Sequence, residues 1–391
     1  MKYDDVICRK NSIIANILLY SMTFLGVGGI AFYAVYFKDF LQILWFILYL
    51  IASLLIAIPL HELGHLIGGK ISGMEFVSYQ VLFFVWIKKN GKIKFQFRMP
   101  HLIGQCIMSV KDGKYDQTHL TGHYMMGGSR TNFILMVLSL IVAIIAFVLW
   151  NIILFPLIAF FFINAYLVIS NMIPLNLKGI YNDGLNNKLM KKYEDAENVI
   201  KDLFILQKMA FNDKTIEEME LFMKNYPSLP YYFIHSFPYD QYWFMLKVHK
   251  KEENSFTYWM KWFNNRHVLP ILYLVQTSIF LAYRRIMFDE EYEYLFQMKE
   301  NRKYLNRKYE SADVEMLFVL KDYKEGLIDQ NRALNLLDLI AEPKDRGETA
   351  SENELFLGLK DMVTLYIKGE YPPKPEPVIN EEAQNEDESN T

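Results

Sequence analysis

Four apolar stretches, each long enough to cross a lipid bilayer, restrict the fold of this chain more than any other feature of its sequence. They cover approximately residues 13–37, 41–60, 132–150 and 152–173. A helix needs about 20 apolar residues to cross the roughly 30 Å of hydrocarbon in a membrane, and each stretch supplies them. The sequence therefore predicts a polytopic membrane bundle of about four spanning helices.

The chain has 391 residues, of which 52% are hydrophobic, but this average joins two unlike halves. The first half carries the apolar stretches, whereas the second is acidic and has apolar residues at helical spacing. We therefore expect a mostly α fold in four parts: a cytosolic N-terminus (1–11), a membrane-embedded domain (12–190), a soluble all-α domain (191–370) and a disordered acidic tail (371–391). The soluble helices resemble a tetratricopeptide-like array, although no clean repeat is present.

One further apolar run, Val268 to Tyr283, raises the question of a fifth span. The run is short for a span, contains Pro270 and ends at two arginines. These features favour a buried helix of the soluble domain.

The segment between the second and third stretches predicts a β-hairpin at residues 76–98. Its second half alternates strictly between polar and apolar side chains, which places Phe95 and Phe97 on the same face. Asn90-Gly91, just before it, fits a two-residue type I′ turn because both residues tolerate a positive φ. The preceding run, Val77 to Ile87, is apolar on both faces, so we expect one strand that lies against or within the membrane interface.

Lysine and arginine residues concentrate before the first span, between the second and third spans, and after the fourth. The two turns that join the first span to the second and the third to the fourth contain a single lysine. Because positive charge marks cytosolic loops, we expect a multi-pass cell-membrane protein, in contact with the lipid bilayer, with both termini in the cytosol. The net charge of −3 gives no indication of nucleic-acid binding, and frequent Ile, Lys, Asn and Tyr favour a bacterial source.

The pentapeptide His61-Glu62-Leu63-Gly64-His65 follows directly on the second apolar stretch. On a helix, its two histidines lie one turn apart on the same face, which is the spacing that binds zinc, and Glu62 is placed to act on water as a general base. Zinc hydrolases usually have a third protein ligand. Spacing alone leaves several candidates open, namely His101, Asp112, Asp116, His119, His123 and Asp183.

Three further motifs give these histidines a context. The third span opens on Gly128-Ser129-Arg130-Thr131-Asn132, the fourth ends on Asn171-Met172-Ile173-Pro174, and Asp183-Gly184 follows. With HELGH and the hairpin, over about residues 40–190, the chain resembles the site-2 protease family of intramembrane zinc metalloproteases. It departs from that family in two places. GSRTN lacks the proline of GPxxN, and eight residues separate Pro174 from Asp183, where the family commonly has a compact NxxPxxxxDG.

The resemblance implies one Zn²⁺ per chain, held by His61, His65 and Asp183. It also implies that Glu62 is the general base and later the proton donor. The longer stretch before Asp183 is the part of this site that the motifs define least.

Four more residues are expected to position the substrate, namely Asn132, Asn171, Phe95 and Phe97. By the same resemblance, Asn132 opens the second core helix, and Asn171 belongs to the segment that unwinds the third. A helical substrate must unwind before cleavage, and the edge of the hairpin offers its extended segment a strand to pair with. We interpret Asn164, within the fourth span, as a residue that hydrogen-bonds between helices.

The expected function is that of a zinc metalloprotease, which hydrolyses membrane-spanning or signal-peptide-derived substrates near the cytosolic face. The alternative is an inactive homologue that acts as a scaffold or regulator through its helical domain, which is also where a protein partner would bind. A transporter is disfavoured because four spans with one hydrolytic motif show no repeat architecture.

Overall fold

The structure is a computed structural model, and it describes residues 3–37, 41–97, 103–150, 154–177, 180–226, 229, 233–250, 252–266, 269–305, 311–340 and 349–370. The chain divides into two compact units. The first consists of Met1–Asp240 with His267–Pro270, and the second of Gln241–Arg266 with Ile271–Thr391. The expected acidic tail (371–391) and His101 lie outside the described residues.

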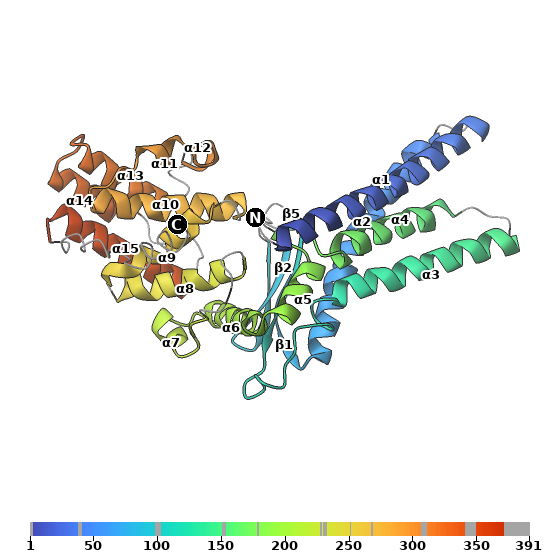
Figure 1. Cartoon of the computed structure of the whole chain (residues 1–391), viewed down its shortest axis with the longest axis horizontal. Helices are drawn as coiled ribbons and strands as arrows, with labels where there is room; N and C mark the ends of the chain where they lie inside the picture. The colour runs from blue at the N-terminus through green and yellow to red at the C-terminus, as the bar shows by residue number, and fades with distance from the viewer. Residues whose placement is uncertain are drawn as a thin grey trace, which may run out of the picture. The chain divides into compact units, whose positions relative to one another are not determined.

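Four long helices form most of the first unit, namely α1 (Tyr3–Phe37), α2 (Leu41–Ile71), α3 (Gly127–Trp150) and α4 (Phe155–Met172). All four are long and apolar enough to cross a membrane, which confirms the number expected from the sequence. Helices α2, α3 and α4 pack against one another, and α1 packs on α2 and α4 (Figure 1). Helix α2 extends beyond the apolar stretch expected at 41–60, because the HELGH turn, which was expected to be helical, and the residues after it continue the helix without a break.

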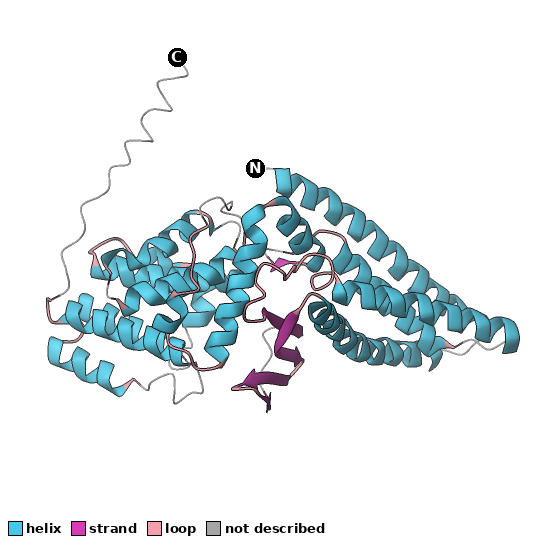
Figure 2. Ribbon diagram, turned by 90° about the horizontal axis from the view of Figure 1, so that it is seen from below, coloured by secondary structure: helices cyan, strands magenta, loops and turns pink. Residues whose placement is uncertain are grey.

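A four-stranded antiparallel sheet lies at one end of these helices (Figure 2). Its strands are β1 (Met74–Val81), β2 (Phe84–Lys89), β3 (Lys92–Phe97) and β4 (Gly104–Val110), in the order β3-β2-β1-β4. The predicted type I′ turn is confirmed, since Asn90 and Gly91 join β2 to β3 with φ values of 51° and 76°.

The prediction of a single strand from Val77 to Ile87 was wrong. The chain turns at Leu82, which has a φ of 51°, so the run forms β1 and β2 of a larger sheet. No Gly, Asn or Pro marks this turn in the sequence. It is stabilised from a distance, because the Leu82 N–H donates to the Ile103 carbonyl at 2.8 Å, next to the unpredicted strand β4.

The sheet is held between helix α2 and helix α6 (Glu194–Phe211). On the α2 side, the Tyr79 hydroxyl donates to the carbonyl of Pro59 at 2.6 Å. On the α6 side, Lys208 forms an ion pair with Glu75 at 2.7 Å. These contacts fix β1 and β4 beside the last turns of α2.

After α4 the chain makes a small hairpin, β5 (Asn176–Leu177) and β6 (Ile180–Tyr181), and enters α5 (Asp183–Lys192). Helix α6 follows, and then α7 (Ile216–Glu220). The sequence groups α6 and α7 with a soluble domain that begins at 191, whereas their contacts group them with the first unit.

The second unit is helical throughout its described residues. Helix α8 (Ser236–His249) leads into it, and it also contains α9 (Thr257–Asn264), α10 (Ile271–Met287), α11 (Glu293–Gln297), α12 (Lys299–Leu305), α13 (Ala312–Lys324), α14 (Gln330–Leu339) and α15 (Ala350–Ile367). Its core is aromatic, with Phe280 of α10 against Phe244 and Trp259 at ring-centroid distances of 4.9 and 4.8 Å. Helix α10 is largely buried and is not among the four helices that fit a span. This agrees with the interpretation of Val268 to Tyr283 as a buried helix.

Candidate metal centre

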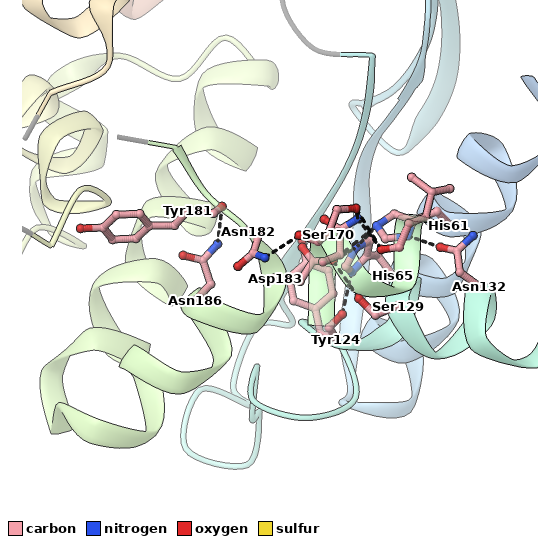
Figure 3. A network of polar contacts seen from close by, with 12 residues as sticks. His61, His65, Tyr124, Ser129, Asn132, Ser170, Tyr181, Asn182, Asp183 and Asn186 are labelled. Carbon is pink, nitrogen blue, oxygen red and sulfur yellow. Dashed lines mark hydrogen bonds and ion pairs between the residues drawn. The ribbon is translucent and has the colours of Figure 1, made fainter. Parts of the chain in front are cut away.

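Two histidines near the end of α2 and the first residue of α5 meet at one point (Figure 3). The Nε2 atoms of His61 and His65 are 3.2 Å apart, and each lies 3.3 Å from Oδ2 of Asp183. The two histidines are buried, and Asp183 is half-buried. Of the five candidates for a third ligand that lie within the described residues, Asp183 is therefore the one that joins the histidines.

The separations among these three atoms fit a metal ion. A tetrahedral zinc ion with nitrogen and oxygen ligands at about 2.0–2.2 Å places those ligands roughly 3.3–3.6 Å from one another. The three atoms here lie at 3.2 to 3.3 Å. His61, His65 and Asp183 can therefore hold a metal ion and leave a fourth position open.

The other nitrogen of each imidazole is already engaged, which directs both Nε2 lone pairs to the same point. Nδ1 of His65 donates to the carbonyl of Tyr124 at 2.7 Å, and Nδ1 of His61 donates to Oδ1 of Asn132. Hydrogen bonds of this kind set the tautomer and ring orientation of metal-binding histidines. The buried environment of the site is thus arranged for coordination through Nε2.

Asn132 is itself held in place by a second asparagine. Its Nδ2 donates to Oδ1 of Asn164 at 2.8 Å, and Nδ2 of Asn164 donates to the carbonyl of Phe160 at 2.8 Å. Both asparagines are fully buried. The interpretation of Asn164 as an interhelical hydrogen-bonding residue is confirmed. A chain of hydrogen bonds, which we call the polar relay, therefore runs from Asn164 in α4 through Asn132 in α3 to His61.

Small residues let α2 and α3 approach closely at this point. A Cβ on Gly64 would lie 2.4 Å from the carbonyl oxygen of Gly127, and a Cβ on Gly128 would lie 2.5 Å from Nε2 of His61. Glycines at helix contacts permit such approach in membrane bundles. Replacing either Gly64 or Gly128 would push α2 and α3 apart beside the two histidines.

Glu62 lies on the same turn of α2 and is buried. Its carboxyl group is close enough to His61, His65 and Asp183 to interact with all three electrostatically, and it hydrogen-bonds to the backbone of Cys106 in β4. A Cβ on Gly104 would lie 2.7 Å from Oε1 of Glu62, so strand β4 passes directly beside this side chain. Glu62 thus sits between the ligand group and the edge of the sheet.

The eight residues between Pro174 and Asp183 bring the chain back to where α4 ends. They contain the hairpin of β5 and β6, which is closed by Leu175 and Asn182: the Asn182 N–H donates to the Leu175 carbonyl at 3.2 Å, and the Leu175 N–H donates to Asn182 Oδ1 at 3.0 Å. Oδ1 of Asn182 also caps α5 by accepting from the Leu185 N–H at 3.0 Å. A hairpin adds length without displacing its ends, so the long insertion leaves Asp183 in position.

The carboxylate of Asp183 has polar neighbours besides the histidines. The Ser129 hydroxyl donates to Oδ2 of Asp183 at 3.5 Å. Burial raises the pKa of Asp183, but His65 and His61 beside it lower the pKa by more. The net pKa lies well below the usual value for an aspartate.

The other four candidates for the third ligand that the structure describes lie elsewhere. Asp112 pairs with Lys208 at 3.1 Å, His119 lies 3.8 Å from Glu197, and Nδ1 of His123 lies 3.3 Å from Arg130. These three residues and Asp116 are exposed, and none of the four belongs to the group formed by His61, His65 and Asp183.

The residues expected to position substrate are dispersed. Asn132 contacts a ligand histidine, while Nδ2 of Asn171 donates to the carbonyl of Leu167 at 3.0 Å within α4. Phe95 and Phe97 are exposed on β3, the sheet edge opposite to β4. The structure does not bring these two aromatic residues to His61, His65 and Asp183, and their role in holding substrate stays a prediction.

Sequence reasoning missed three contributors to the site: Tyr124, Ser129 and Asn182. Asn182 could have been found, because an asparagine directly before a helix is a typical N-cap. Tyr124 contributes a backbone carbonyl to His65, which no side-chain pattern predicts. Comparison of the chain with protein-family models, with curated proteins and with solved structures finds no match.

Proposed function

We propose that this chain is a membrane-embedded zinc metallopeptidase that hydrolyses membrane-spanning or signal-peptide-derived substrates near the cytosolic face. One observation carries the proposal. The Nε2 atoms of His61 and His65 and Oδ2 of Asp183 converge at 3.2 to 3.3 Å, with Glu62 beside them. The four helices long and apolar enough to cross a membrane, one of which carries both histidines, support the membrane location.

The chemistry follows from the residues around the ligand group. Bound zinc would supply a Lewis acid and make water nucleophilic near neutral pH. The Glu62 carboxylate would accept the proton of the attacking water and pass it to the leaving amine. His61, Asp183 and their hydrogen-bond partners would hold the metal at a fixed position relative to Glu62.

The position of strand β4 supports the proposal that the substrate binds in an extended conformation. Strand β4 is an edge strand of the sheet, and it is the strand that passes beside Glu62. An unwound segment that adds to the sheet next to Glu62 would therefore lie along β4, and not along β3 with Phe95 and Phe97.

The test compares wild-type protein with Glu62→Gln in cells, by mass spectrometry of the peptides that accumulate in the membrane fraction. The variant keeps the shape of the side chain but removes the base, so cleavage should fall by about 10²–10⁴-fold while zinc content is unchanged. The exposed His119→Gln serves as the control and should cleave like wild type.

Loss of cleavage with retained zinc supports the proposal. If zinc-loaded wild-type and Glu62→Gln proteins leave the same set of membrane peptides, the chain is not a peptidase. A role as a scaffold or regulator through the helical second unit would then replace the proposed function.

A further inference from the structure

The end of α4 leaves backbone carbonyl groups that no helical N–H can reach. Pro174 stops the helix, which ends at Met172, and a proline has no N–H to continue it. Irregular backbone at the depth of a membrane is tolerated only where its polar groups find partners within the protein. The partners of these carbonyls therefore decide how firmly the segment before Asp183 is held.

Two asparagine side chains provide those partners. From within the segment, Nδ2 of Asn182 donates to the carbonyls of Ser170 and Ile173, both at 2.6 Å (Figure 3 shows the bond to Ser170). From outside it, Nδ2 of Asn11 in α1 donates to the carbonyl of Pro174 at 3.0 Å. Helix α1 is thus bonded to the residue at which the metal-ligand segment begins.

The bonds from Asn11 to Asp183 form a short continuous path. Pro174 is followed by Leu175, which makes two hydrogen bonds with Asn182, and Asn182 precedes Asp183. Each step is either a peptide bond or a hydrogen bond of 3.0 to 3.2 Å. A displacement of Pro174 would therefore be transmitted along these bonds to the Asp183 carboxylate.

Asn11 stands out among the described side chains of helix α1. Among its described side chains only Ala15 is buried, and Asn11 is the one whose hydrogen bond reaches another element. Farther along the helix, a pocket of about 190 Å³ lies between α1, α2 and α4. Its walls include Met22 and Gly26 of α1 and Phe162 of α4. Among the described side chains of α1, the bond from Asn11 is therefore the polar connection to the rest of the unit.

We infer that Asn11 is a positioning residue of the metal centre, through which helix α1 holds the segment that carries Asp183. The inference rests on the proposed metal site and assigns the first helix a part in it. When the bond is lost, the Pro174 carbonyl is left unpaired, and Asp183 is held less firmly against His61 and His65. Metal affinity should fall without any change in the ligands themselves.

The test measures zinc affinity of the full-length protein in lipid nanodiscs by competition with a chelator. Asn11→Ala and Asn11→Asp both remove the donor, the second with almost no change in shape. Each should bind zinc roughly three- to tenfold more weakly than wild type, which is the effect of losing one neutral hydrogen bond. Asn16→Ala removes an exposed asparagine of the same helix and should bind like wild type.

A second readout separates positioning from general loss of stability. Visible absorption of the Co²⁺-substituted protein reports ligand geometry, and the bands of both Asn11 variants should shift while those of Asn16→Ala do not. Unchanged zinc affinity and unchanged bands in both Asn11 variants would overturn the inference and leave the proposed function intact. Weaker zinc binding in the Asn11 variants of a protein that cleaves no peptide would support the inference while the proposed function fails.

Discussion

Helices α2 and α10 contain similar fractions of apolar residues, but they differ in which side chains are buried. In α2 the apolar flank is open, with Ile51 at 53% exposure, while His61 and His65 near its end are buried. In α10 the apolar side chains are covered by the helices of the second unit, and Phe280 is only 3% exposed. The comparison teaches that the fraction of apolar residues alone does not distinguish a candidate span from a core helix. What distinguishes them is the environment that covers the apolar side chains.

The buried polar groups of the two regions differ in the same way. In α10 the hydroxyls of Thr277 and Ser278 donate to carbonyls of their own helix, at 2.7 and 2.8 Å. Near the end of α2 the polar groups bond across helices, from Asn164 through Asn132 to His61. The hydroxyls of Thr277 and Ser278 thus satisfy mainly their own helix, whereas the groups from α3 and α4 converge on His61.

The largest effect is expected from truncating the core of the second unit. Phe280→Ala removes a ring that packs against Phe244 and Trp259, and it should lower the free energy of unfolding by about 3–5 kcal/mol. Hydrogen–deuterium exchange of peptides from residues 271–287 in the full-length protein measures the loss. Leu272→Ala, at an exposed position of the same helix, is the control and should cost less than about 1 kcal/mol. Equal exchange in the two variants would contradict the burial of α10.

A somewhat smaller effect tests the membrane assignment itself. Ile51 in α2 and Leu272 in α10 are equally exposed, at 53%. If α2 faces lipid, Ile51→Lys should cost about 2.5–3.5 kcal/mol of insertion free energy, whereas Leu272→Lys faces water and should change stability by about 0.5 kcal/mol or less. The fraction of each variant that resists carbonate extraction from membranes measures the difference. If both lysines are tolerated equally, α2 does not face the lipid.

The smallest effect concerns the polar relay. Asn164→Ala leaves the amide of Asn132 unpaired and should weaken zinc binding about 10–100-fold, the usual consequence of disturbing a group that orients a ligand. Thr277→Ala, whose hydroxyl bonds only within α10, should leave zinc affinity unchanged. Chelator competition on the two purified variants gives both values. An Asn164→Ala protein with wild-type affinity would mean that the relay contributes packing and not metal binding.

The features that the sequence predicted correctly have a local physical signature. The four long helices follow from apolar length, the turn at Asn90-Gly91 follows from tolerance of positive φ, and the pairing of His61 with His65 follows from helical spacing. Each depends on residues that are neighbours in the chain, so the pattern is visible before the fold is known.

The features that the sequence did not predict depend on distant contacts. The turn at Leu82 is stabilised by Ile103, and the insertion before Asp183 folds into a hairpin closed by Leu175 and Asn182. Asn164 was predicted to bond between helices, but its connection to a metal ligand needs the relative placement of α3 and α4. Neither composition nor spacing encodes which carbonyl or amide meets which side chain across the bundle.

The central claim is that His61, His65 and Asp183 bind a zinc ion together, and zinc X-ray absorption of the purified full-length protein tests it most directly. The account predicts about one zinc per chain, with two imidazole nitrogens and oxygen ligands at about 2.0–2.2 Å, and loss of that signal in Asp183→Ala. A wild-type protein without stoichiometric zinc, or one whose zinc spectrum is the same in Asp183→Ala, would contradict it.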